Sequence, residues 1–219
     1  MKSRLAVGGP GATRNASGGG WLQSAVFALD RRIRRRLGVY EYTFHPQCLF
    51  RLQLVRVDDP LLLTDGTAVA PGSRVLALHL WNERIPVMGP LGPTLAWARK
   101  CDRAIRVSLR ELARYLAAQP SLKDIAAVCG DMPVTGAGQA KQLARIMARY
   151  GFEAAVGIAD RRSLIHRFGD AVLVLMLVLA TNPCVARSAI LRCCNIRLFV
   201  SRAALERRYT ESMRAASQA

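Results

Sequence analysis

The spacing of apolar residues divides this 219-residue chain into a β-rich part and a helix-rich part. Between residues 48 and 57, apolar and polar side chains alternate, which is typical of a strand with one buried face. Turn-forming pairs follow at 65–66 and 71–72, and a second alternating run occupies 75–81. We therefore predict that residues 48–81 form a small antiparallel meander.

From Thr94 onwards the apolar period becomes about 3.6 residues, which is the period of an amphipathic helix. The first such helix should end before Pro120, because proline cannot continue a helix. The further predicted elements are short strands at 124–130 and 152–158, a helix over 138–151, and a last helix that Ser201 caps and that ends near Met213. Helices and strands that alternate in this way favour an α+β domain.

The most apolar segment spans residues 164–181. Its uninterrupted run, 171–180, falls well short of the roughly 20 apolar residues that cross a bilayer. We predict a buried helix at the centre of the domain, and insertion into a membrane is the alternative. The resulting fold class is α+β, with a small antiparallel or mixed sheet covered by helices and one central hydrophobic helix. The predicted boundaries are a disordered tail over 1–20, a single domain over 21–209 with an antiparallel sheet at 41–81, and a loose C-terminal tail over 210–219.

The helix predicted over residues 21–37 carries a dense run of arginines in its last turns. The run consists of Arg31, Arg32, Arg34, Arg35 and Arg36. Beside an apolar stripe, such a run fits the interface of an anionic membrane, where each basic residue contributes about 1 kcal/mol. The alternative is that the stripe packs on the core and the arginines face water. Arg161 and Arg162, before the apolar segment, belong either to the same anionic-surface contact or to a solvated rim.

Basic residues outnumber acidic residues by 32 to 15, which gives a formal net charge of +17. This balance favours an anionic partner such as nucleic acid, anionic lipid or an acidic polymer. A GC-rich coding sequence would explain part of the arginine excess without any function. The six cysteines form no CxxC pair and the three histidines are scattered, so we expect neither a metal site nor a cofactor. No secretory segment is recognisable, so we expect free thiols in the cytoplasm.

Polar side chains gather at the end of the strand that contains His79. Trp81, Asn82 and Glu83 follow, where they can converge on a ligand. His79 with Glu83 would form the acid/base pair of an enzyme pocket. The alternatives are a histidine satisfied in the core, and a turn asparagine beside a surface glutamate. Asp65 in the first turn and Trp81 are further candidate ligand contacts, although aspartate is also an ordinary turn residue.

Five segments carry a resemblance to a known family. They are LDRRIRRRLGVYEYTFHPQCLFRL, LTDGT with PGSRVLALHLWNERIP, SLRELARYLAAQPSLKDIAAVCGD, HRFGDAVLVLMLVLATNP and LFVSRAALERRY. In this order they resemble the YkoP-like family of uncharacterised bacterial proteins, over residues 21–209. The resemblance implies a cell-envelope or glycan context, because similar domains are joined to polysaccharide deacetylases. It implies no deacetylase chemistry, because the three histidines cannot form the Asp-His-His metal site of those enzymes.

Three functional hypotheses follow. The first is a cytoplasmic, peripheral membrane-associated accessory protein that binds an anionic lipid, a glycolipid or a glycan precursor in cell-envelope metabolism. The second is a nucleic-acid-binding module, which the charge favours although no familiar binding motif is recognisable. The third is an enzyme built on His79, Asn82 and Glu83. The apolar faces of 21–37 and 164–181 would also allow a homodimer.

Overall fold

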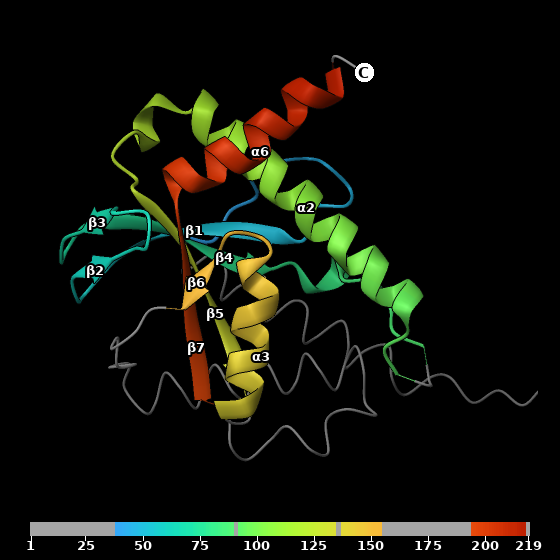
Figure 1. The fold of residues 1–219 in the computed structure, drawn as a ribbon. Helices are drawn as coiled ribbons and strands as arrows, with labels where there is room; N and C mark the ends of the chain where they lie inside the picture. Colours follow the sequence, from blue (N-terminus) through green and yellow to red (C-terminus); the bar gives the residue numbers. More distant parts are fainter. Residues whose placement is uncertain (1–37, 90–91, 135–136, 155–193, 218–219) are drawn as a thin grey trace, which may run out of the picture.

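A mixed sheet forms the centre of the protein (Figure 1). The computed structural model describes residues 38–89, 92–134, 137–154 and 194–217. Within these residues, five strands pair in the order β1-β4-β5-β7-β6. Their bounds are Phe50–Arg56 for β1, Arg74–Leu80 for β4, Ala127–Val134 for β5, Glu153–Ala154 for β6 and Cys194–Ser201 for β7. β4 and β5 run parallel and the other neighbours run antiparallel, which confirms the α+β class and the mixed sheet.

Three helices pack on one face of this sheet in the described part of the chain. They are α2 (Leu95–Ala118), α3 (Ala137–Ala148) and α6 (Arg202–Ser217). Because successive strand residues point to opposite faces, the core residues under the helices occupy alternate positions. These strand residues are Leu52, Leu76, Val128, Leu198 and Val200.

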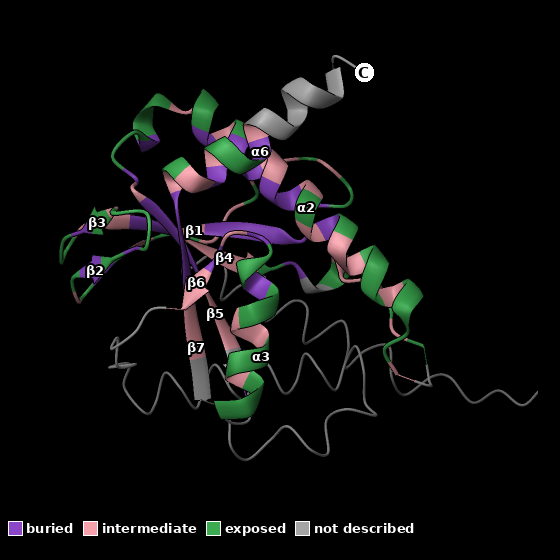
Figure 2. Ribbon diagram, viewed as in Figure 1, coloured by how far each residue is buried: buried purple, intermediate pink, exposed green. Residues whose placement is uncertain are grey.

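Helix α2 is anchored by its C-terminal two thirds and projects beyond the core at its start. Leu109, Leu112 and Leu116 are completely buried against the sheet and α6. None of the residues 95–103 is buried. Figure 2 shows the same change along α2, from buried positions where it crosses the sheet to exposed ones at its far end.

Residues 57–73 do not form the meander predicted over 48–81. β1 pairs directly with β4, while the two-residue strands β2 (Leu61–Leu62) and β3 (Ala68–Val69) form a separate hairpin. The hairpin lies over the sheet face opposite the helices, where its apolar side chains join a second cluster. This cluster includes Leu61, Leu63 and Val69 of the hairpin, with Val75, Ala127, Cys129 and Phe199 of the sheet. Burial of these side chains is the physical reason that the hairpin leaves the sheet.

The helix ends follow the predicted signals, except at the C-terminus. Thr94 caps α2, because its Oγ1 accepts a hydrogen bond from the Trp97 N–H over 3.2 Å. Ser201 caps α6 in the same way, with 2.9 Å between its Oγ and the nitrogen of Ala204. Helix α6 continues to Ser217, beyond the end predicted near Met213, so most of the tail predicted as loose is helical. Its sequence contains no glycine or proline that would stop it.

Several predictions lie outside the described residues. These are the tail over 1–20, the helix over 21–37 with its arginine run, and the hydrophobic helix over 164–181. The single-domain boundaries also stay predictions. No helix in the described ranges combines the length and the apolar character that crossing a membrane requires.

Candidate functional site

His79 lies near the end of β4, on the sheet face opposite the helices. Its ring is half-buried, and Nε2 lies 2.8 Å from Oε1 of Gln53 on β1. In the antiparallel register, Arg51 stands directly opposite His79. The imidazole thus has a neutral amide as a hydrogen-bond partner, and the acid/base pairing of His79 with Glu83 stays a prediction.

Two arginine side chains cover the ring of Trp81. Trp81 is 8% exposed, and the guanidinium carbons of Arg51 and Arg84 lie 4.0 and 3.3 Å from its ring centroid. Such cation–π contacts contribute about 0.5–2 kcal/mol each. Arg84 is held further by a 2.8 Å hydrogen bond from its Nη1 to the carbonyl oxygen of His45. The structure thus gives the Trp81 ring two arginine contacts, and its role as a ligand contact stays a prediction.

Arg51 carries a buried charge that two glutamates balance. The residue is 7% exposed, and its Nη2 lies 3.3 Å from Oε1 of Glu41. Its Nη1 lies 3.6 Å from Oε2 of Glu83, which is too long for a hydrogen bond. A buried cation needs such countercharges, because desolvation costs several kcal/mol. The structure thus brings His79 and Glu83 to the same arginine, and the side chain of Asn82, in the short 3-10 turn Asn82–Arg84, lies outside what is described.

Asp65 connects the turn of the β2–β3 hairpin to the start of α6. Its Oδ1 accepts a hydrogen bond from the Thr67 N–H over 3.0 Å, and its Oδ2 accepts one from the Ser201 hydroxyl. The bond from Ser201 is the main reason that the pKa of Asp65 lies below its ordinary value. Both carboxylate oxygens therefore have protein partners, and a ligand role of Asp65 stays a prediction.

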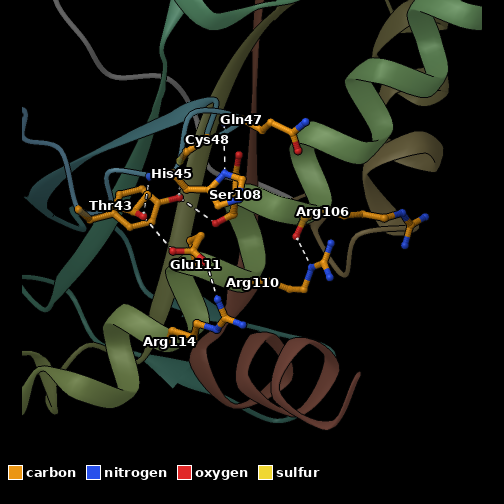
Figure 3. A network of polar contacts seen from close by, with 10 residues as sticks. Thr43, His45, Gln47, Cys48, Arg106, Ser108, Arg110, Glu111 and Arg114 are labelled. Atoms are coloured by element: carbon orange, nitrogen blue, oxygen red, sulfur yellow. Dashed lines mark hydrogen bonds and ion pairs between the residues drawn. The ribbon is translucent and has the colours of Figure 1, made fainter. Parts of the chain in front are cut away.

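A network of polar contacts ties the loop before β1 to the middle of α2 (Figure 3). The Thr43 hydroxyl donates to Oε2 of Glu111 over 2.8 Å, and the Leu49 N–H donates to the Ser108 hydroxyl over 2.8 Å. The Tyr42 hydroxyl donates to the carbonyl oxygen of Ser108 over 2.8 Å, and burial raises the pKa of Tyr42 well above its ordinary value. These bonds fix the loop against the helix.

The outer face of α2 carries five arginines, which we call the arginine stripe. They are Arg99, Arg103, Arg106, Arg110 and Arg114. At about 100° and 1.5 Å per residue, they fall within about 80° of one another around the helix and span about 22 Å along it. Most buried residues of α2, such as Leu112, lie on the opposite side, and the buried Ala113 borders the stripe next to Arg106. The stripe is therefore the solvent face of an amphipathic helix.

Acidic neighbours on α2 engage two members of the stripe. Nε of Arg106 lies 3.0 Å from Oδ2 of Asp102, and Nη1 of Arg114 lies 2.6 Å from Oε1 of Glu111. Pairs within one helix contribute only a few tenths of a kcal/mol. The Arg106 pair is half-exposed on both sides, whereas Glu111 is only 17% exposed and also accepts from Thr43. Five cations against two carboxylates leave the face with a net positive charge.

The first two members of the stripe are the most accessible. Arg99 and Arg103 are exposed, and neither has a hydrogen bond or ion pair among the described residues. They lie on the part of α2 that projects beyond the core. Figure 3 shows Arg106 and Arg110 pointing away from the loop that contains Thr43. Four members of the stripe are exposed and Arg110 is half-buried, so most of the stripe is accessible to a partner.

The sequence analysis did not predict the stripe, although its signal is visible. Cationic residues recur on α2 at intervals of four, three, four and four residues. The apolar period predicts the helix itself, whereas the stripe is readable from the period of its charged side. The predicted anionic-surface contacts, Arg31–Arg36, Arg161 and Arg162, lie outside the described residues.

Metal chemistry gains no support from the described residues. Among them, no three His, Cys, Asp or Glu side chains come close enough to hold a metal ion together. Cys48, Cys101 and Cys129 are not in disulfides, and burial raises the pKa of the Cys101 thiol.

Fold and surface together define a class: a basic α+β domain whose helices cover one face of a mixed sheet and present an arginine stripe to solvent. The family model of the YkoP domain matches residues 40–209. The chain therefore belongs to the YkoP domain family, which confirms the resemblance. No curated protein and no solved structure matches the chain.

Proposed function

We propose that the protein is a peripheral membrane-associated accessory protein, which binds an anionic lipid or an anionic glycan precursor in cell-envelope metabolism. The arginine stripe of α2 is the observation that carries the proposal. It places five cations on one exposed helix face, where a flat anionic surface reaches all of them at once. A net charge of +17 supports the same kind of partner. The proposed location is the inner face of the cytoplasmic membrane.

Electrostatic attraction of this size gives reversible binding. Each arginine near an anionic leaflet contributes about 1 kcal/mol, so the five together contribute at most about 5 kcal/mol. Arg106 and Arg114 contribute less than the others, because carboxylates already face them. The expected behaviour is therefore salt-sensitive association without insertion.

An exposed apolar side chain one turn before Arg99 adds to the attraction. Leu95 at the start of α2 is 68% exposed. Apolar side chains next to a basic helix face are typical of surfaces that rest in the headgroup region of a membrane.

Co-sedimentation with vesicles tests the proposal. The full chain is mixed with phosphatidylcholine vesicles, with or without phosphatidylglycerol, and the bound fraction is measured. We expect binding to the anionic vesicles only. The variant Arg99→Glu with Arg103→Glu should bind more than about 30-fold more weakly, because it loses two contacts of about 1 kcal/mol each and adds repulsion.

A matched variant controls for total charge. Lys123→Glu with Lys141→Glu changes the net charge by the same amount at exposed residues on other elements. The control should lose no more than about threefold. Equal losses in both variants would mean that total charge attracts the protein and that the stripe has no special role. Absence of binding to anionic vesicles would overturn the proposal.

Nucleic acid is the alternative partner, because the same stripe could face a phosphate backbone. Five phosphate contacts would give log affinity a slope of about −4.5 against log salt concentration. Binding to duplex DNA that outcompetes anionic vesicles at equal phosphate concentration would favour this alternative. The enzyme hypothesis, with His79, Asn82 and Glu83, gains no comparable support, because the described contacts of Trp81 and Glu83 are with arginines of the protein itself.

A further inference from the structure

Two buried tyrosines join three helical elements at one point beside the arginine stripe. The Tyr150 hydroxyl donates to Oδ1 of Asp102 on α2 over 2.8 Å. The Tyr209 hydroxyl of α6 donates to the carbonyl oxygen of Tyr150 over 3.1 Å. Both tyrosines are buried, so the turn between α3 and β6 is locked against α2 and α6. We call this place the tyrosine junction.

Gly151 shapes the turn at the junction. Its φ of +95° lies in the left-handed region, which glycine adopts without strain. A Cβ at this position would lie 3.7 Å from Cδ of Arg208. The turn therefore passes close to α6, and Nη2 of Arg208 donates to the carbonyl oxygen of Arg149 over 2.7 Å.

Four arginines surround the tyrosine junction, with one carboxylate among them. They are Arg106 and Arg110 of α2, Arg149 of the turn and Arg208 of α6. The guanidinium carbon of Arg106 lies 5.4 Å from the ring centroid of Tyr150, and both side chains contact Asp102. Arg208 donates to the carbonyl oxygen of Arg149 next to Tyr150, and Arg110 follows Arg106 by one turn of α2. Burial raises the pKa of Tyr150 to about 12, so its hydroxyl stays neutral near pH 7. Four cations against one anion leave a concentrated positive charge.

Much of the donor capacity of these arginines is unused within the described chain. Arg106 and Arg110 form their hydrogen bonds through Nε, to Asp102 and to the carbonyl oxygen of Arg106. Arg208 uses Nη2, and the Arg149 side chain has no hydrogen bond among the described residues. Arg106, Arg149 and Arg208 are exposed. The existing bonds hold Arg106, Arg110 and Arg208 in place and leave further N–H groups for a ligand.

Phosphate is the chemical group that fits these donors. Guanidinium groups bind phosphate oxygens with two parallel hydrogen bonds, which makes arginine the preferred partner of phosphate. A phosphomonoester carries nearly two negative charges near pH 7 and three terminal oxygens, so it can engage several arginines at once. A phosphodiester or a carboxylate carries only one charge.

We infer that the tyrosine junction is a binding site for the phosphomonoester headgroup of an anionic lipid. The inference rests on the proposed function, because it assumes that the neighbouring stripe brings the junction to a membrane. Arg106 and Arg110 belong to both surfaces, whereas Arg149 and Arg208 belong only to the junction. The stripe supplies general attraction to negative charge, and the junction supplies selection of the headgroup.

Two vesicle types of equal surface potential test the inference. One contains phosphatidic acid, a phosphomonoester, and the other contains phosphatidylserine, each in phosphatidylcholine. We expect wild-type protein to bind the phosphatidic acid vesicles about tenfold more tightly, which is the scale of one charge-assisted hydrogen bond. Arg149→Gln, whose side chain has no hydrogen bond among the described residues, should abolish this preference, and so should Arg208→Gln. Lys141→Gln, with the same charge change elsewhere, should keep it.

The outcomes separate this inference from the proposed function. Equal binding to both vesicle types, with Arg149→Gln behaving like Lys141→Gln, overturns the junction site and leaves the membrane function standing. Absence of binding to either vesicle overturns the membrane function. In that case a calorimetric titration with glycerol 3-phosphate decides about the junction. If the wild-type protein gives a heat of binding and Arg149→Gln gives none, the junction is a site for a free phosphomonoester. If the wild-type protein gives no heat, the junction site is overturned as well.

Discussion

Removal of the Ser201 hydroxyl tests how the protein holds its hairpin and its last helix together. Ser201 is buried and serves two partners, because its Oγ accepts from the Ala204 N–H and donates to Oδ2 of Asp65. Ser201→Ala removes both hydrogen bonds and leaves no large cavity. The loss of stability in this variant should therefore come from the cap of α6 and from the link to the hairpin turn.

The expected loss follows from the two bonds. A missing serine cap costs about 1 kcal/mol. A hydrogen bond to a carboxylate contributes more than a neutral one, but Asp65 is exposed and water replaces the lost partner, so we expect about 0.5–1 kcal/mol. The sum is about 1.5–2 kcal/mol. For a protein of this size that lowers Tm by about 3–8 °C.

Thr94→Ala is the matched control in a thermal unfolding experiment. Thr94 caps α2 through an exposed hydrogen bond of 3.2 Å and has no carboxylate partner among the described residues. It should lower Tm by less than Ser201→Ala does. A double-mutant cycle of Ser201→Ala with Asp65→Asn should show a coupling of about 0.5–1 kcal/mol.

The pKa of Asp65 provides an independent readout. The Ser201 hydroxyl keeps this pKa below 3.8 in the folded protein, so Ser201→Ala should raise it. Because the folded-state pKa is lowered, the link stabilises the protein above about pH 4 and is lost as the pH falls through the folded pKa. The reasoning is refuted if Ser201→Ala and Thr94→Ala lower Tm equally and the Asp65 pKa, followed by NMR, does not move.

Three further changes have definite expected results. Leu112 is completely buried, so Leu112→Ala should lower the free energy of unfolding in urea by about 2–5 kcal/mol. Leu62 is 74% exposed, so the control Leu62→Ala should lower it by less than about 0.5 kcal/mol. Gly151 has a φ of +95°, which strains an alanine, so Gly151→Ala should lower the free energy of unfolding by about 1 kcal/mol or more. An unchanged urea midpoint would contradict this expectation. The Asp102 pKa is lowered below 3.8, chiefly by its hydrogen bond from Arg106. Asp102→Asn should therefore destabilise the protein at pH 7 by up to about 1 kcal/mol. The difference between variant and wild type should shrink as the pH falls below about 4, because the half-exposed carboxylate of the wild type is then protonated. A difference that does not depend on pH would exclude the ionic contribution.

The secondary structure followed from local patterns, whereas the pairing of strands did not. Alternation predicted β1, and the 3.6-residue period with Thr94 and Ser201 predicted the starts of α2 and α6. The parallel pairing of β4 with β5 joins segments about 50 residues apart, and no local pattern encodes such a partner. The hairpin left the sheet because Leu61 and Leu63 bury on its face, which depends on tertiary packing.

In the candidate sites too, features within one element were readable from the sequence, whereas contacts between distant segments were not. The contact of His79 with Gln53 and that of Glu83 with Arg51 depend on the register of β1 against β4, which no local pattern encodes. The arginine stripe was readable from spacing alone, since one helix carries all of it. The tyrosine junction was not, because Arg149 and Arg208 meet across 59 residues of sequence.

The central claim is that the arginine stripe of α2 is the contact with an anionic membrane surface. The decisive measurement is the affinity for phosphatidylglycerol-containing vesicles of wild-type protein, of Arg99→Glu with Arg103→Glu, and of Lys123→Glu with Lys141→Glu. We predict reversible binding for the wild type and, within about threefold, for the lysine variant, and a loss of more than about 30-fold for the stripe variant. Identical affinities of the two double variants would contradict the claim, and so would a wild-type protein that leaves these vesicles unbound.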